Sequence, residues 1–481
     1  MTITSLNFVV FALVSVLLIN AAARLPWSGA RALAMLTCNL VFIASFAGRG
    51  AWSLLPMAAF VGFGLLVIHA LRTAPGQRHF WPLLTLTLTG FFWLKKYGFV
   101  PEALWLGAPY VTLGLSYILF RILQIIIDTR EGLLVGRLGV VDYLNYLLNF
   151  PAFISGPIQR FQDWAEQQRE PLALSWEAFG EAVERIATGA FKVIVLAPVF
   201  LAWHAEARQV LAPAMPAWDT AAAGLQIVGG YAIFLFLNFS GYTDIVIGVA
   251  RLFGCGLPEN FNRPFAAASF LDFWARWHMS LSDWLKTYVY SPLVKNLMRR
   301  FPARRFEPYI GVVAFFVTFF LIGLWHGQTA VFALYGFLLG LGVSGNKLHQ
   351  ITMAKRLGRK RYAELARNAA YLALGRGLTF GWFSLSLVCF WARWDQITQL
   401  WGQLGWRGAG LTALALVLAA ALVFSAADWL RNTALRPQAG GAPLLHHRYL
   451  RTVLVTALAV VTVVSVALTS GPAPDIVYKN F

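Results

Sequence analysis

Two histidines occupy positions where an ionisable side chain is costly. His326 stands in Gly323-Leu324-Trp325-His326-Gly327, which joins two apolar segments, and His278 lies in an aromatic stretch at 258–293. An unperturbed imidazole titrates near neutral pH, so such a ring can take the proton of a hydroxyl nucleophile. Because ionisable residues at membrane depth usually face a cavity or a partner, His326 is a candidate catalytic base. The alternative is a turn histidine at the membrane interface.

Further polar side chains interrupt apolar segments. Asp244 would either line a polar cavity or be satisfied by neighbouring helices in a buried polar network. Arg121, Gln124 and Asp128 recur at i, i+3 and i+7, which places them on one helix face. That face would point to a reaction chamber or form a structural salt bridge. The three cysteines lie far apart without metal-ligand spacing, so we expect neither a disulfide framework nor a metal site.

The composition indicates the kind of element that carries these residues. Of 481 residues, 58% are hydrophobic and 12% charged, which excludes an ordinary soluble enzyme. The 39 Lys and Arg exceed the 21 Asp and Glu, giving a formal charge of +18. In a soluble protein this excess would suggest a nucleic acid partner, but here the basic residues gather between apolar runs. The charge therefore indicates membrane topology, with lipid as the surroundings and no nucleic acid partner.

Apolar runs long enough to cross a bilayer, about 20 residues, recur throughout the chain. We expect an all-α polytopic integral membrane protein with about 11 to 13 membrane segments, forming one domain over 1–481. A run at 82–95 is too short to assign. The expected spans are 7–23, 32–48, 52–71, 109–128, 137–155, 182–203, 221–250, 309–325, 328–346, 370–392, 408–428 and 452–470.

Three basic loops orient these segments. Residues 295–307 carry five Lys and Arg, 347–367 carry seven, and 431–451 carry four. Two apolar segments separate each loop from the next, so all three can lie on the cytoplasmic side, as the positive-inside rule requires. The protein is then a multi-pass protein of the cytoplasmic (inner) membrane, and its tail, 471–481, is extracytoplasmic.

The stretch 258–293 is too polar for a lipid-facing span and too aromatic for a solvated loop. It would form either an interfacial amphipathic helix or the lining of a polar cavity. A GxxxG pair at Gly336 and Gly340 is typical of a close helix contact. On a helical wheel one face of the stretch is aromatic and apolar, and it gathers Phe273, Trp274, Trp277, Leu281, Trp284 and Tyr288.

Four blocks of sequence resemble the membrane-bound O-acyltransferase family, in the bacterial branch that contains alginate O-acetyltransferases and teichoic acid D-alanyl transferases. They are FPAFISGPI at 150–158, NFSGY at 238–242, PENFN through FWARWHMSLS at 258–282, and LWHG at 324–327. Their order fits the family over about residues 100–350. The resemblance implies a ring of tilted helices around a central tunnel.

The resemblance also implies roles for individual residues. His326 would be the catalytic residue and His278 the second histidine of the pair. No metal is implied. The remaining expected site residues would contact substrate, and they are Trp325, Trp277, Asn260, Arg276, Ser280 and Asp244.

The implied reaction moves an acyl group, acetyl in our interpretation, from a cytoplasmic thioester to an extracytoplasmic polysaccharide or cell-envelope polymer. The donor would be acetyl-CoA or an acyl-carrier protein, and a periplasmic or membrane-anchored SGNH-like acyltransferase would be a partner. FPAFISGPI leans toward the D-alanyl transferases, whereas NFSGYTD leans toward the polysaccharide acetyltransferases. Val294-Lys295-Asn296 replaces the glycine pair usual in the alginate branch, which leaves the acceptor polymer open. The alternative reaction is D-alanyl transfer from a carrier-protein thioester.

A non-enzyme alternative is a polytopic transporter or polymer-export channel, although the chain lacks the paired halves typical of repeat-built transporters. The tail resembles the aromatic tail of the polysaccharide acetyltransferases through Tyr478 and Phe481, while Ile476 and Lys479 depart from it. By that resemblance Tyr478 would accept the acyl group, with His326 as base, before a partner passes it on. Otherwise Tyr478 anchors a frayed end at the interface.

Overall fold

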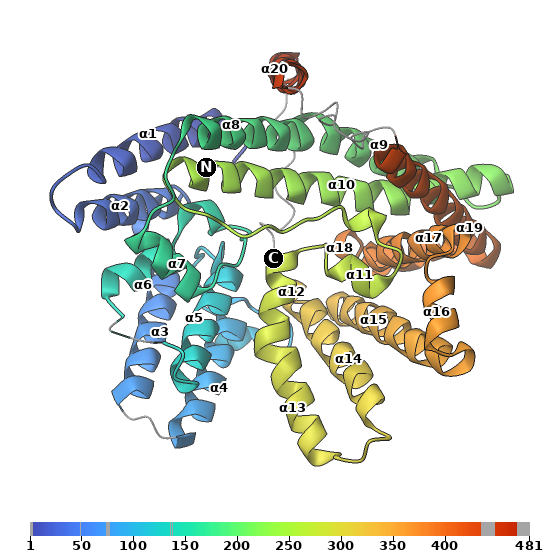
Figure 1. Cartoon of the computed structure of the whole chain (residues 1–481), viewed down its shortest axis with the longest axis horizontal. Helices are drawn as coiled ribbons and strands as arrows, with labels where there is room; N and C mark the ends of the chain where they lie inside the picture. The colour runs from blue at the N-terminus through green and yellow to red at the C-terminus, as the bar shows by residue number, and fades with distance from the viewer. Residues whose placement is uncertain are drawn as a thin grey trace. The chain divides into compact units, whose positions relative to one another are not determined.

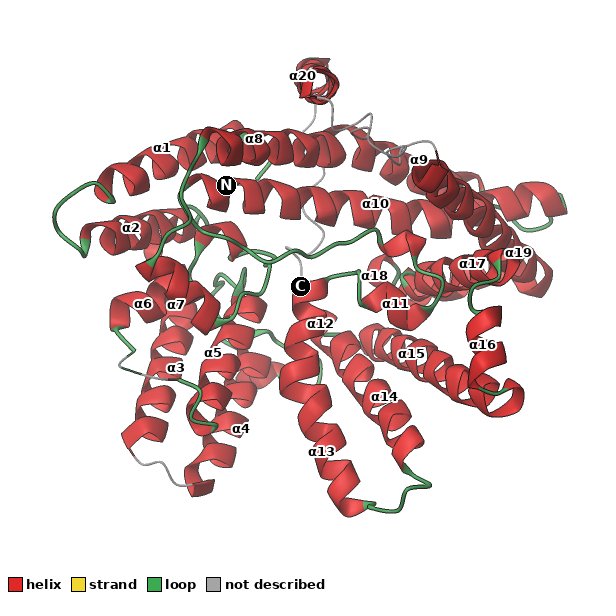
Figure 2. Ribbon diagram, viewed as in Figure 1, coloured by secondary structure: helices red, strands yellow, loops and turns green. Residues whose placement is uncertain are grey.

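The computed structural model describes residues 3–48, 50–73, 77–134, 136, 138–433 and 448–468. These residues form helices joined by loops, and the described chain contains no strand (Figures 1 and 2). The tail at 471–481 and its Tyr478 lie outside the described residues. The chain folds into two compact units. Helix α10, Ala217–Leu252, contributes its first part to one unit and its second part to the other.

The all-α polytopic fold is confirmed. Within the described residues, eight helical stretches are long and apolar enough to cross a membrane: Ala51–Thr73, Trp176–Val210, Ala217–Leu252, Glu307–His326, Ala330–Leu357, Ala369–Trp391, Trp394–Asn432 and Tyr449–Leu468. Two further helices, α1 (Leu6–Ala22) and α2 (Ala30–Ala44), are apolar but shorter, with 17 and 15 residues.

The first unit comprises the described residues of 1–193 and 239–259, together with the last residues of helix α20 (Arg448–Leu468). Within it α3, α4 and α5 pack side by side, and α1 packs on α2 (Figure 1). Its helices are α1 (Leu6–Ala22), α2 (Ala30–Ala44), α3 (Leu55–Thr73), α4 (Gln77–Leu94), α5 (Leu115–Arg130), α6 (Val140–Leu147), α7 (Phe161–Arg169), α8 (Trp176–Phe191) and the second part of α10.

The second unit comprises 194–238 and 260–466. Within it α14 packs on α15, and α17 packs on α19. Its helices are α9 (Ala197–Val210), the first part of α10, α11 (Phe270–Trp274), α12 (Met279–Leu285), α13 (Ser291–Arg300), α14 (Glu307–His326), α15 (Ala330–Leu357), α16 (Arg359–Leu365), α17 (Ala369–Ser386), α18 (Val388–Trp391), α19 (Trp394–Thr433) and most of α20 (Arg448–Leu468).

The expected span at 137–155 is wrong, because the helix there ends early. Helix α6 stops at Leu147, and a single 3-10 turn, Phe150–Ala152, follows in an irregular but buried segment. Pro151 keeps the helix from continuing, since a proline cannot donate a main-chain hydrogen bond to the carbonyl four residues earlier, here that of Leu147, and its ring would clash with that carbonyl. The undecided run at 82–95 belongs to the 18-residue helix α4.

The GxxxG pair forms the close helix contact that the sequence predicts. A Cβ atom added to Gly323 of α14 would lie 2.1 Å from the Cα of Gly336 on α15, and one added to Gly340 would lie 2.9 Å from the Phe316 carbonyl oxygen. Only glycine allows the two backbones to approach so closely. Because Gly323 is three residues before His326, this contact fixes the end of α14 that carries the histidine.

Candidate active site

His326 is the last residue of α14 and is 2% exposed. Its ring is surrounded by aromatic rings from three helices. The ring centroid lies 4.6 Å from that of Trp325, 5.7 Å from that of Tyr335 on α15 and 5.2 Å from that of Phe390 on α18. The Tyr335 ring is stacked nearly parallel to the imidazole, at 17°. His326 is therefore buried among aromatic side chains, and its role as the catalytic base stays a prediction.

His278 is 1% exposed and adopts a left-handed backbone conformation, with φ 45° and ψ 52°. It precedes α12 and so divides the stretch 258–293 into short helices, where a continuous amphipathic helix was one expectation. A non-glycine residue in this region is strained by about 1–2 kcal/mol, and surrounding contacts must hold it. His278 is therefore positioned by its neighbours and not by helix propensity.

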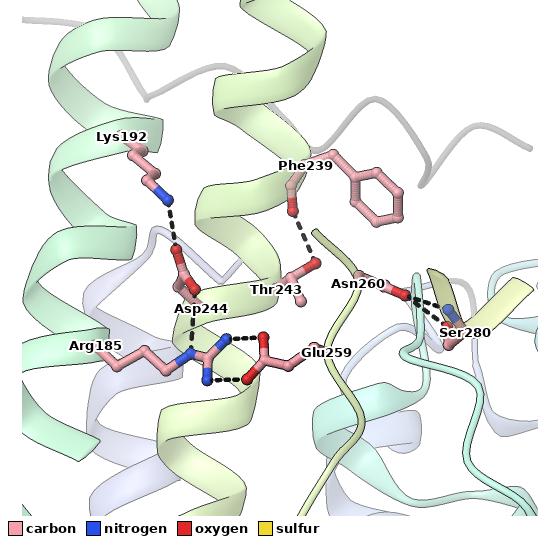
Figure 3. A network of polar contacts seen from close by, with 8 residues as sticks. All are labelled: Arg185, Lys192, Phe239, Thr243, Asp244, Glu259, Asn260 and Ser280. Carbon is pink, nitrogen blue, oxygen red and sulfur yellow. Dashed lines mark hydrogen bonds and ion pairs between the residues drawn. The ribbon is translucent and has the colours of Figure 1, made fainter. Parts of the chain in front are cut away.

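Those neighbours form a main-chain clamp around His278. Asn262 N–H donates to the Arg276 carbonyl at 2.9 Å, and Met279 N–H donates to the Asn260 carbonyl at 3.0 Å. The Oδ1 atom of Asn260 then accepts two hydrogen bonds from Ser280, at 3.2 Å from the amide and 2.6 Å from the hydroxyl (Figure 3). Asn260 is 0% exposed. The hydrogen bonds between Asn260 and Ser280, together with the main-chain bonds of the clamp, therefore position the His278 loop.

His278 and His326 lie in the same unit, within range of an electrostatic interaction between their rings. They come from separate elements, the loop before α12 and the end of α14. The structure thus places in one region the two residues that the family resemblance paired.

A cavity of about 330 Å³ lies beside this pair, between the segment 271–290 and α14. Met279, which follows His278, and Ile322, one turn before His326, both line it. Its walls are largely apolar, with Ser282, Asp283 and Lys286 as polar lining residues, and Lys286 is exposed. Such a cavity suits an apolar acyl thioester whose charged part stays near the entrance.

Trp277 and Arg276 have mainly structural contacts. The Trp277 ring is 1% exposed and lies 4.8 Å from the Phe383 ring and 5.1 Å from the Phe261 ring. Arg276 donates to the carboxylate of Asp272 at 2.9 Å on the same helical turn. Substrate contact by either residue stays a prediction, and so does contact by Trp325, which is half-buried beside His326.

Asp244 forms a polar network within the first unit. Its carboxylate accepts from Arg185 at 3.1 Å and from Lys192 at 2.7 Å, and Arg185 also forms a bidentate pair with Glu259 (Figure 3). The Asp244 side chain is 16% exposed. Asp244 is thus satisfied by neighbouring helices, which was one of the two interpretations. Its expected contact with substrate stays a prediction.

The polar face of α5 also has structural partners. Arg121 is 2% exposed and donates to the carbonyls of Leu147, at 2.6 Å, and Ala152, at 3.0 Å. It therefore holds the irregular segment after α6, where main-chain carbonyls have no helical partner. Gln124 donates to Asp128 at 3.3 Å. Of the two interpretations the structural one is favoured, although the partners of Arg121 are carbonyls and not a carboxylate.

Some residues around the site carried no signal in the sequence. Tyr335 and Phe390 lie in ordinary apolar helices, and only the packing of α15 and α18 brings their rings to His326. In the described ranges, no group of three His, Cys, Asp or Glu side chains is placed to hold a metal ion.

The site is thus a pair of buried histidines near an apolar cavity, in a chain whose long apolar helices are of the kind that cross a membrane. The sequence model of MBOAT, the membrane-bound O-acyltransferase family, matches residues 83–371. The chain belongs to this family. The match includes both histidines and every residue of the clamp.

Similar proteins occur in two groups. A teichoic acid D-alanyltransferase of Bacillus subtilis is 30% identical over 47% of this chain and 56% of its own length. A second one, from Streptococcus thermophilus, is 32% identical over 58% of this chain and 68% of its own length. A probable alginate O-acetylase of Pseudomonas putida is 31% identical over 61% of this chain and 59% of its own length. The similarity thus covers between 56% and 68% of these relatives and does not separate the two groups.

Proposed function

We propose that this protein is a membrane O-acyltransferase that moves an acyl group from a cytoplasmic thioester to a hydroxyl of an extracytoplasmic polysaccharide or cell-envelope polymer. The observation that carries the proposal is the pairing of His278 and His326 beside the cavity of the second unit. Family membership supports the same activity and argues against a transporter or export channel.

The proposed chemistry needs one base and no metal. A ring nitrogen of His326 takes the proton of the attacking hydroxyl, and the hydroxyl oxygen forms a bond to the thioester carbonyl carbon. The tetrahedral intermediate then collapses, the carbon–sulfur bond breaks, and the imidazolium returns its proton to the leaving thiolate. The products are an ester and a free thiol. His278 would orient the acyl donor next to this base.

The donor would be acetyl-CoA or a carrier protein bearing an acyl thioester, entering from the cytoplasmic side. The basic loops 295–307 and 347–367 flank α14 and α15 and hold twelve Lys and Arg, five and seven respectively. They would attract the phosphates of CoA or an acidic carrier protein. Basic residues beside a membrane also bind anionic lipid, so the loops have a second use.

We propose acetyl as the acyl group and D-alanyl as the alternative, because the relatives include proteins named for each reaction. In our proposal the protein lies in the cytoplasmic (inner) membrane with its C-terminus outside. On that side the acyl group would pass either directly to a hydroxyl of the polymer or, through Tyr478, to a periplasmic or membrane-anchored SGNH-like partner that passes it on.

The proposal is tested by incubating membranes that contain the protein with radiolabelled acetyl-CoA, an acetylated carrier protein or a D-alanylated carrier protein, each with a polysaccharide acceptor. Membranes without the protein are the control. We expect a hydroxylamine-labile ester from one of the acetyl donors. Ester formation from the D-alanyl carrier alone would favour the alternative, and no ester from any donor would contradict acyl transfer.

A further inference from the structure

A second cavity, of about 300 Å³, lies in the same unit as the histidine pair and differs from the first in its chemistry. It lies among α9, α18, α19 and the turn of α10 at Ile227. Its polar lining consists of Arg208, Gln209, Trp391, Gln396, Gln399 and Gln403. Arg208, Gln209 and Gln399 are exposed, and Trp391, Gln396 and Gln403 are half-buried, so their polar groups are available to a ligand that enters the cavity.

We propose that this cavity binds the acceptor, as a short stretch of hydroxyl-rich chain that bears an anionic group. Each glutamine amide offers one acceptor oxygen and two donor hydrogens, a set that matches neighbouring sugar hydroxyls. The guanidinium of Arg208 supplies a planar donor group for a carboxylate. The inference rests on the proposed function and names the substrate that this part of the site takes.

The polar lining around Trp391 is ordered before any ligand arrives. The guanidinium of Arg208 lies 4.6 Å from the centre of the Trp391 ring, and the ring of His204 lies 4.7 Å from it. His204 is held in turn by its Nδ1 atom, 2.8 Å from the Ile227 carbonyl oxygen. The indole N–H of Trp391 is buried and has no hydrogen-bond partner in the described part of the chain. A ligand hydroxyl would satisfy that donor.

Two consecutive residues of α18 contact His326 and this cavity. Phe390 places its ring 5.2 Å from that of His326, and the next residue, Trp391, lines the cavity. With the basic loops on the cytoplasmic side, α14 and α17 both run outward, so His326 and Trp391 lie toward the outer ends of their helices. An acceptor held there approaches His326 from the side opposite to the donor loops.

The test measures binding separately from catalysis. Purified full-length protein is titrated with a fluorescent oligouronate, a neutral oligosaccharide of equal length, and glycerol phosphate as the headgroup probe. We expect the oligouronate to bind most tightly. Losing two glutamine amides in Gln399→Leu/Gln403→Leu should weaken that binding about tenfold. Arg208→Gln should weaken oligouronate binding and leave the neutral oligosaccharide unaffected.

The matched control is Gln226→Leu, which changes an exposed glutamine of α10 outside the cavity lining and should bind as wild type. An unchanged KM for the thioester donor shows that the variants are folded. Equal oligouronate binding by wild type and the double variant would overturn the inference, as would binding of glycerol phosphate alone. Saccharide binding that depends on the glutamines, without any acyl transfer, would support the cavity and contradict the proposed function instead.

Discussion

Asn260 offers the sharpest perturbation of the His278 loop, because its Oδ1 atom accepts two hydrogen bonds from Ser280 inside a fully buried clamp. Asn260→Ala removes both bonds and keeps the main-chain bonds of the clamp. At about 1 kcal/mol for each bond, the ordered loop loses about 2 kcal/mol. The contacts that remain then no longer offset the strain of the left-handed conformation at His278.

If Asn260 acts by positioning, the loss affects the catalytic step. Because about 1.4 kcal/mol corresponds to tenfold in rate, kcat should fall by up to about 30-fold while the KM of the donor changes little. Steady-state kinetics with radiolabelled donor measures both constants. Ser280→Ala, which removes only the hydroxyl bond at 2.6 Å, should show about a fivefold fall in kcat.

Asn262→Ala is the matched control, since Asn262 is exposed and its clamp bond comes from the main chain. It should retain wild-type kinetics. A raised KM with unchanged kcat in Asn260→Ala would refute positioning and would make Asn260 a substrate contact, as the family resemblance first implied. Wild-type values for both constants would refute both roles.

Three further outcomes follow from the same account. His278→Ala should lose part of its activity while retaining donor binding; a loss as large as that of His326→Ala, with donor binding kept, would reverse the two roles. Neutralising the basic residues of the loop 295–307 should raise the donor KM at low salt, and an unchanged KM would exclude docking there. Enzyme incubated with donor and no acceptor should gain one acyl group by intact mass, and Tyr478→Phe should not; an unmodified wild type with proven turnover would favour direct transfer. The residues neutralised in the loop are Arg299, Arg300, Arg304 and Arg305.

The sequence predicts most of the helices because hydrophobic length is a local property. It fails at 137–155, where composition suggests a span and Pro151 breaks the helix. It leaves 258–293 undecided, because the left-handed turn at His278 depends on Asn260, which is distant in sequence. The GxxxG contact is predictable from spacing alone, since glycine allows close approach whatever the surrounding fold.

The site shows the same division between local and distant information. His326 is recognisable because a histidine between two apolar segments is costly without a role. Its aromatic neighbours Tyr335 and Phe390 are not recognisable, because many apolar helices carry such residues. The polar lining at Gln399 and Gln403 is hidden for a related reason, since a single sequence does not reveal which side chains meet in a cavity.

The role of His326 as the base is tested most directly by single-turnover acyl transfer in His326→Ala, with His69→Ala as the matched control. His69 is an exposed histidine of α3, outside the basic loops and the site. Loss of a general base typically costs about 10²–10⁴-fold in rate. We predict a fall of that size for His326→Ala, with membrane insertion and donor binding retained, and wild-type rates for His69→Ala. Full activity in His326→Ala would contradict the account.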